Sequence, residues 1–169
     1  MSTTAPVKTA TPSTLDPSVQ ARLLDEGYGP GAWHGPDMKA ALTDVTSTAA
    51  FWRPGAGRHN IAEIALHHAW CVRSVIGQLT GKTQAPFPLE GEDWFDLSDG
   101  RRLAWTKVTA LVEDQQRRLA RVVVDIGAGR SPSPLSEPER FDLVLGVTCH
   151  AVYHAGQIQL IKVLGATKK

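Results

Sequence analysis

Hydrophobic residues recur every three or four positions along most of the chain, which is the spacing of one face of an α-helix. The strongest such patterns cover residues 60–79, 101–126 and 138–164. Weaker patterns cover residues 16–26 and 37–50. We predict a helix over each of these five ranges.

Glycine and proline separate the predicted helices, and the alternating pattern typical of β-strands is missing. The longest connection, residues 82–100, joins the patterns at residues 60–79 and 101–126 and carries Trp94 and Phe95. These aromatic residues either form a lid over a site or anchor the loop to the helices, and we favour the anchor. The sequence therefore predicts an all-α fold, a four-helix bundle with one long loop between its second and third bundle helices.

A single domain over residues 16–169 suits the length of the chain. Residues 1–15 are rich in Ser, Thr, Ala and Pro, and we predict a disordered tail there. This segment lacks the apolar core of a secretory signal, and no apolar run approaches the roughly 20 residues that span a bilayer. We expect a cytoplasmic protein that does not contact membranes, with its two cysteines reduced.

The formal net charge of +1 provides no basic surface of the kind that nucleic acids require, so we expect no direct nucleic-acid binding. A different chemistry is indicated by His150 and His154, four residues apart within an apolar helical face. Side chains at this spacing lie about 5–6 Å apart and can reach one metal ion. The alternative is a pair of core histidines whose nitrogens find ordinary hydrogen-bond partners.

A third ligand is expected from another helix, because two histidines alone would hold a metal weakly. The candidates are His67 and His68, both within the predicted helix 60–79. His68 follows the stronger apolar stripe, whereas His67 shares a face with Glu63 and Cys71. The periodicity does not choose between the two histidines.

Four segments resemble, in order and spacing, the DinB/YfiT-like superfamily. They are WHGP at 33–36, WRP at 52–54, HNIAEIALH at 59–67 and HAVYHAGQI at 150–158. The resemblance implies a four-helix bundle, often a homodimer, with a divalent metal bound by one histidine of the second bundle helix and two of the last. Carried over to this chain, the ligands would be His67, His150 and His154, so the resemblance favours His67 over His68.

Several neighbours could support such a site. Glu63 could orient His67, although we favour its role as the capping-box partner of Asn60. Gln157, one turn beyond His154, could bind a substrate or bond across helices. Cys71 could approach the metal, although a small buried residue is the preferred interpretation. Basic residues that could bind an anionic substrate are Arg53, Arg58 and Lys82, and residues that could line the mouth of the site are His34 and His59.

An open site of three imidazoles is the pattern of a catalytic metal centre. The resemblance implies hydrolysis or the transfer of a low-molecular-weight thiol to a small-molecule substrate. Thiol transfer is slightly favoured, because no general base is evident beside the ligands. Zinc or nickel is the expected metal, with iron or manganese as alternatives. The alternative function is a non-catalytic stress-response module with a structural metal or a ligand-binding role.

Overall fold

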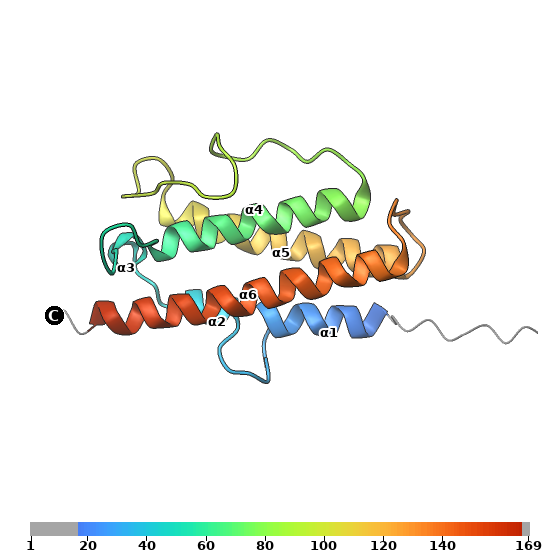
Figure 1. Cartoon of the computed structure of the whole chain (residues 1–169), viewed down its shortest axis with the longest axis horizontal. Coiled ribbons are helices and arrows are strands. Elements are labelled where there is room, and N and C mark those ends of the chain that lie inside the picture. The colour runs from blue at the N-terminus through green and yellow to red at the C-terminus, as the bar shows by residue number, and fades with distance from the viewer. Residues whose placement is uncertain (1–16, 167–169) are drawn as a thin grey trace, which may run out of the picture.

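A computed structural model describes residues 17–166, and within this range every regular element is a helix (Figure 1). The long helices are α1 (Pro17–Tyr28), α4 (Ile61–Thr80), α5 (Trp105–Gly127) and α6 (Glu137–Ala166), and the short ones are α2 (Met38–Leu42) and α3 (Ser47–Phe51). The predicted tail, residues 1–15, lies outside the described residues.

The four long helices form the predicted bundle. Helix α4 packs between α5 and α6, and α1 contacts the same two helices from the other side. The loop 81–104 connects α4 to α5 and passes along the outer side of α4 (Figure 1). The prediction of an all-α bundle with a long loop between its second and third helices is therefore confirmed for the described residues.

The prediction of one helix over residues 37–50 is wrong, because the chain forms α2 and α3 with a break between them. Asp37 caps α2, and Thr46 caps α3 by accepting the N–H of Ala49 at 3.2 Å. Between the caps, Asp44 adopts a left-handed φ of 59°, which no continuous helix contains. A second capping side chain thus begins a new helix where the apolar pattern suggested continuity.

Two other helix boundaries differ from the prediction. Helix α5 begins at Trp105 and not at residue 101, because Asp99 accepts the backbone N–H of Arg101 in a local turn. Helix α1 continues through Gly27, which was expected to end it. A Cβ atom at Gly27 would lie 3.0 Å from the Cβ of Ala151, so this glycine allows α1 to approach α6 closely.

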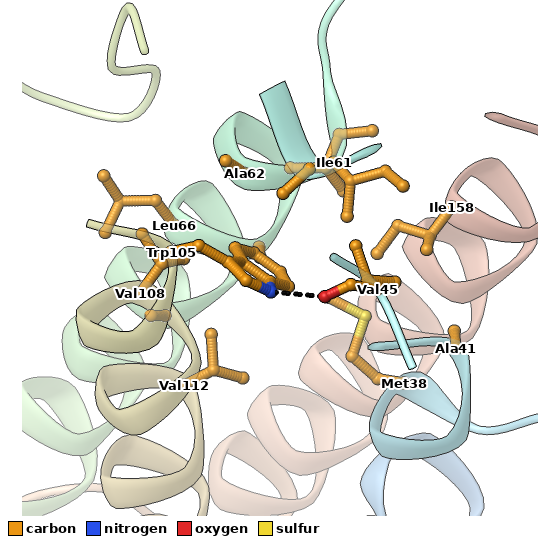
Figure 2. Packing of buried hydrophobic residues seen from close by; sticks show 14 of the residues in the cluster. Met38, Ala41, Val45, Ile61, Ala62, Leu66, Trp105, Val108, Val112 and Ile158 are labelled. Atoms are coloured by element: carbon orange, nitrogen blue, oxygen red, sulfur yellow. Dashed lines mark hydrogen bonds between the residues drawn. The ribbon is translucent and has the colours of Figure 1, made fainter. Parts of the chain in front are cut away.

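Buried apolar side chains fill the bundle, and α2 packs against α6. Figure 2 shows Met38 and Ala41 of α2 beside Ile158 of α6. The buried indole N–H of Trp105 donates to the carbonyl oxygen of Val45 at 2.8 Å (Figure 2). This hydrogen bond ties the start of α5 to the segment after α2 and satisfies the one polar atom of the indole.

The carboxylate of Glu63, at the start of α4, forms hydrogen bonds to the segment before the helix and to the loop after it. Its side chain is only 2% exposed. It forms a capping box with Asn60, as the sequence predicts, and it accepts both terminal nitrogens of Arg53 and the backbone N–H of Leu97 at 2.8 Å. His59 Nδ1 lies 3.0 Å from the same carboxylate. One buried anion thus holds the segment 53–60 and the loop 81–104 against α4.

Glu63→Gln should lower the free energy of unfolding by about 1–3 kcal/mol at pH 7, because the charged hydrogen bonds to Arg53 are weakened. Burial on its own raises the pKa of Glu63, but the hydrogen bonds from Arg53, Leu97 and His59 outweigh it and hold the pKa below the usual 4.5. The stabilisation is therefore present above pH 4.5 and is lost as the pH falls through the lower folded-state pKa. Urea titrations at several pH values should show the two proteins converging in acid.

The control is Glu113→Gln, since Glu113 is exposed and lies 3.8 Å from Lys39. Its stability should stay within about 0.5 kcal/mol of the wild type. Equal effects of the two substitutions, or a Glu63→Gln effect that does not depend on pH, would contradict the role assigned to Glu63.

Candidate metal centre

Three histidines from two helices meet between α4 and α6. His67 comes from α4, and His150 and His154 come from successive turns of α6. The Nε2 atom of His150 lies 3.0 Å from the Nε2 atoms of both His67 and His154. One ligand atom from each residue lies within 4.8 Å of the others, so this group could hold a metal ion.

The surroundings keep the rings of His150 and His154 uncharged. His67 and His154 are buried, and His150 is half-buried. Burial and the neighbouring imidazoles of His154 and His67 lower the pKa of His150 to about 4. Burial and His67 likewise lower the pKa of His154 to about 4, against an opposing hydrogen bond to Gln157. Both rings are therefore neutral at pH 7, which is the state that binds a metal.

The outer nitrogens of two of these rings face acceptors. His67 Nδ1 lies 3.0 Å from both the carbonyl oxygen and a carboxylate oxygen of Asp93. His154 Nδ1 lies 2.7 Å from Oε1 of Gln157. Because a neutral imidazole has one N–H and one lone pair, these acceptors direct the lone pairs of both Nε2 atoms to the meeting point. This donor set fits a divalent transition metal with outer-sphere partners already in place.

The two adjacent histidines of α4 point to different neighbours. His67 joins His150 and His154, whereas His68 is fully buried and points toward α5. His68 Nδ1 lies 3.3 Å from His150 Nδ1, and His68 Nε2 lies 2.6 Å from the amide nitrogen of Gln116. The structure thus brings together the three histidines predicted as ligands and leaves His68 behind one of them. Metal binding by the three stays a prediction.

The other site candidates have distinct places. The carboxylate of Glu63 is occupied by Arg53, Leu97 and its capping partner, and Asp93 is the residue that contacts the outer nitrogen of His67. Cys71 Sγ lies 3.8 Å from His67 Nε2, and Cys71, His67 and Asp93 form a second group that could hold a metal. Burial, with the nearby charge of Asp93, raises the pKa of the Cys71 thiol to about 11, so it remains protonated at pH 7.

The two aromatic residues of the long loop have different roles: Phe95 anchors the loop, and Trp94 covers a histidine. Phe95 is buried in the apolar core and anchors the loop. The indole of Trp94 lies between two imidazoles, 3.7 Å from the ring centre of His59 and 4.0 Å from that of His67, with nearly parallel planes. Trp94 therefore covers one face of His67 and restricts the orientation of this ring.

Sequence reasoning missed Asp93 and Gln116 as partners of the histidines. Asp93 carries no signal, since it is one acidic residue within an irregular loop. Gln116 did carry a sequence signal, because it interrupts the apolar stripe between Val112 and Leu119. The structure confirms that it is buried, with only 8% exposed. A polar side chain at a core position needs a buried partner, and here the partner is His68.

Two surface hollows reach side chains that contact the histidines, and both have Arg58 and His59 in their walls. The larger, of about 630 Å³, lies between α6 and the segment 54–59 and reaches Gln157, with Leu160 and Leu164 on its apolar side. The smaller, of about 320 Å³, also touches Trp94. The larger hollow therefore reaches Gln157, which contacts His154, and the smaller one reaches Trp94, which stacks on His67.

The fold and the centre define a class of protein, a helical bundle with three convergent imidazoles that could hold a metal. The sequence pattern of the DinB superfamily matches residues 32–158, which is more than half of the chain and includes all three histidines and Gln157. The chain therefore belongs to the DinB superfamily. No curated protein and no solved structure matches it. Among the described helices, none combines the length and apolar character needed to cross a membrane.

His67→Ala, His150→Ala and His154→Ala should each abolish stoichiometric zinc binding, because two imidazoles hold the ion weakly. The measurement is elemental analysis after dialysis against a defined zinc concentration, with circular dichroism to confirm the helical fold. His34→Ala is the matched control, since the His34 ring is exposed and its Nε2 lies 2.8 Å from the carbonyl oxygen of Glu26. Zinc retained by His67→Ala but lost from His68→Ala would show that the assignment is wrong by one residue.

Proposed function

We propose that this protein binds one divalent transition metal ion through the Nε2 atoms of His67, His150 and His154 and acts as a metal-dependent enzyme. The main support is the convergence of these atoms: Nε2 of His150 lies 3.0 Å from Nε2 of His67 and 3.0 Å from Nε2 of His154. Within residues 17–166, no fourth His, Cys, Asp or Glu joins this group. Three protein ligands are the pattern of catalytic zinc sites, whereas structural sites have four.

A divalent ion held in this way supplies the Lewis acidity that activates a water or a thiol as a nucleophile. The protein residues supply orientation. Asp93 and Trp94 fix the ring of His67, and Gln157 fixes the ring of His154. Imidazole donors favour zinc or nickel, with iron or manganese as alternatives.

Between the two chemistries, we favour transfer of a low-molecular-weight thiol over hydrolysis. A general base would assist hydrolysis by a metal-bound water, and the buried carboxylate of Glu63 is occupied by Arg53 and Leu97. The nearest thiol of the chain, Cys71, has a pKa of about 11 and is a poor nucleophile at pH 7. A nucleophilic sulfur would therefore come from a separate thiol cofactor.

We expect the substrates to bind in the 630 Å³ hollow beside Gln157. Its exposed Arg58 offers a guanidinium to an anionic group, and His59 offers a ring nitrogen at the same wall. Leu160 and Leu164 offer an apolar surface opposite these polar groups. This combination suits a small molecule with one acidic group and an apolar body.

Metal-loaded protein should join a low-molecular-weight thiol to a chromogenic alkylating electrophile faster than the same thiol reacts alone. His154→Ala should reduce this acceleration by at least about 100-fold, which corresponds to about 2.7 kcal/mol of barrier. Cys71→Ser should keep the wild-type rate, because the nucleophile is external. Ester hydrolysis without added thiol would instead support the hydrolase reading, and no turnover of either kind would support a non-catalytic module.

We also propose that two copies of the chain associate through the outward face of α6. Between residues 143 and 161 this helix carries no Asp, Glu, Lys or Arg. Its exposed positions include Tyr153 and Leu160, about 60% exposed, and Gly156, where an added Cβ would meet nothing within 4 Å. A helix that is apolar on all sides is usually covered on all sides, and a neutral face suits a second copy of itself.

Tyr153→Lys should convert a dimer into a monomer, because it places a charge at the centre of this face. Light scattering coupled to size exclusion measures the mass, and metal content should remain at one ion per chain. Val124→Lys, on the exposed side of α5, is the matched control and should leave the mass unchanged. A wild-type monomer, or a dimer that persists in Tyr153→Lys, would contradict this interface.

A further inference from the structure

The buried ring of His68 lies directly behind His150. The two rings are stacked with an angle of 19° between their planes, and their Nδ1 atoms are 3.3 Å apart. On its other side, His68 Nε2 lies 2.6 Å from the side-chain amide of Gln116. His150, His68 and Gln116 therefore form a continuous hydrogen-bonded chain from α6 through α4 to α5.

Such a chain has two arrangements that keep both rings neutral. In the first, the Gln116 amide N–H donates to His68 Nε2, and His68 Nδ1–H donates to His150 Nδ1. The N–H of His150 then lies on Nε2, between His67 and His154. In the second, His150 Nδ1–H donates to His68 Nδ1, and His68 Nε2–H donates to the turned amide oxygen of Gln116.

Only the second arrangement offers the lone pair of His150 Nε2 to the meeting point of the three histidines. His67 and His154 already offer theirs, because Asp93 and Gln157 accept from their Nδ1 atoms. His150 differs, since its Nδ1 faces another imidazole that can donate or accept. The nitrogen of His150 that carries the hydrogen thus depends on Gln116, which acts through His68.

We propose that His68 and Gln116 are positioning residues that orient His150 and select its metal-binding tautomer. The proposal rests on the metal site of the proposed function and extends it to α5, which supplies none of the three imidazoles. His68 is fully buried and Gln116 is 8% exposed, so water does not readily replace either partner. Outer partners of this kind typically change metal affinity by 10- to 100-fold.

Gln116→Met tests the proposal, because methionine keeps the volume of glutamine and removes its strong acceptor. The zinc dissociation constant, measured by competition with a chromophoric chelator, should rise by about 10-fold or more. Gln116→Glu should restore binding to the wild-type value or tighter, since a carboxylate only accepts and therefore favours the second arrangement. Circular dichroism should show that both variants keep the wild-type helical content.

Gln115→Met and Gln115→Glu are the matched controls. Gln115 is equally buried on the same helix, but its amide oxygen bonds to Arg118 at 3.4 Å and not to a histidine. Neither control should change the zinc dissociation constant by more than about twofold. An equal response to Glu at both positions would show a general charge effect and would overturn the proposal.

A second readout needs no variant. Nitrogen-15 NMR of the zinc-loaded wild type distinguishes a ring nitrogen that carries hydrogen from one with a lone pair. We expect His68 to carry its hydrogen on Nε2 and His150 on Nδ1. Hydrogen on Nδ1 of His68, or unchanged zinc affinity in Gln116→Met, would overturn this proposal alone. A wild-type protein that binds none of zinc, nickel, iron and manganese would overturn the proposed function as well.

Discussion

A neutral imidazole has one donor and one acceptor, and this constraint governs the centre of the molecule. Four imidazoles lie together between the helices, and burial keeps those of His68, His150 and His154 uncharged at neutral pH. Each buried nitrogen then needs a partner of the opposite kind. Within residues 17–166, every buried side-chain nitrogen or oxygen has another polar atom within hydrogen-bonding distance, and for the three Nε2 atoms of His67, His150 and His154 that atom is another Nε2. The partners Asp93, Gln116 and Gln157 therefore decide where the lone pairs point.

The irregular segments are as necessary to this centre as the helices. Glu63 holds both of them against α4 through Arg53 and Leu97, and the loop thereby brings Asp93 and Trp94 to His67. The bundle alone would leave one face of that ring exposed. A buried anion at the start of α4 thus helps to orient the ring of His67 one turn later.

The proposed enzyme would use both features, the partners that orient the imidazoles and the loops that Glu63 anchors. The preformed geometry of the three histidines would reduce the reorganisation needed when a metal binds, and the carboxylate of Glu63 is occupied by Arg53. The adjacent hollow, with Arg58 on one side and leucines on the other, offers contacts of two kinds to a small molecule. An activated external nucleophile and a bound acceptor are the requirements of group transfer.

Residue spacing was sufficient to predict the helical bundle, the capping box at Asn60 and the shared face of His150 and His154, because each depends on neighbours within one or two turns. It was insufficient at Gly27, where α1 continues because α6 lies against it, and at residues 43–46, where caps override the apolar period. Spacing also left His67 and His68 undecided; the family resemblance favoured His67, and the tertiary structure gives the physical reason. Both rings are buried, and only the packing of α4 between α5 and α6 directs one to His154 and the other to Gln116.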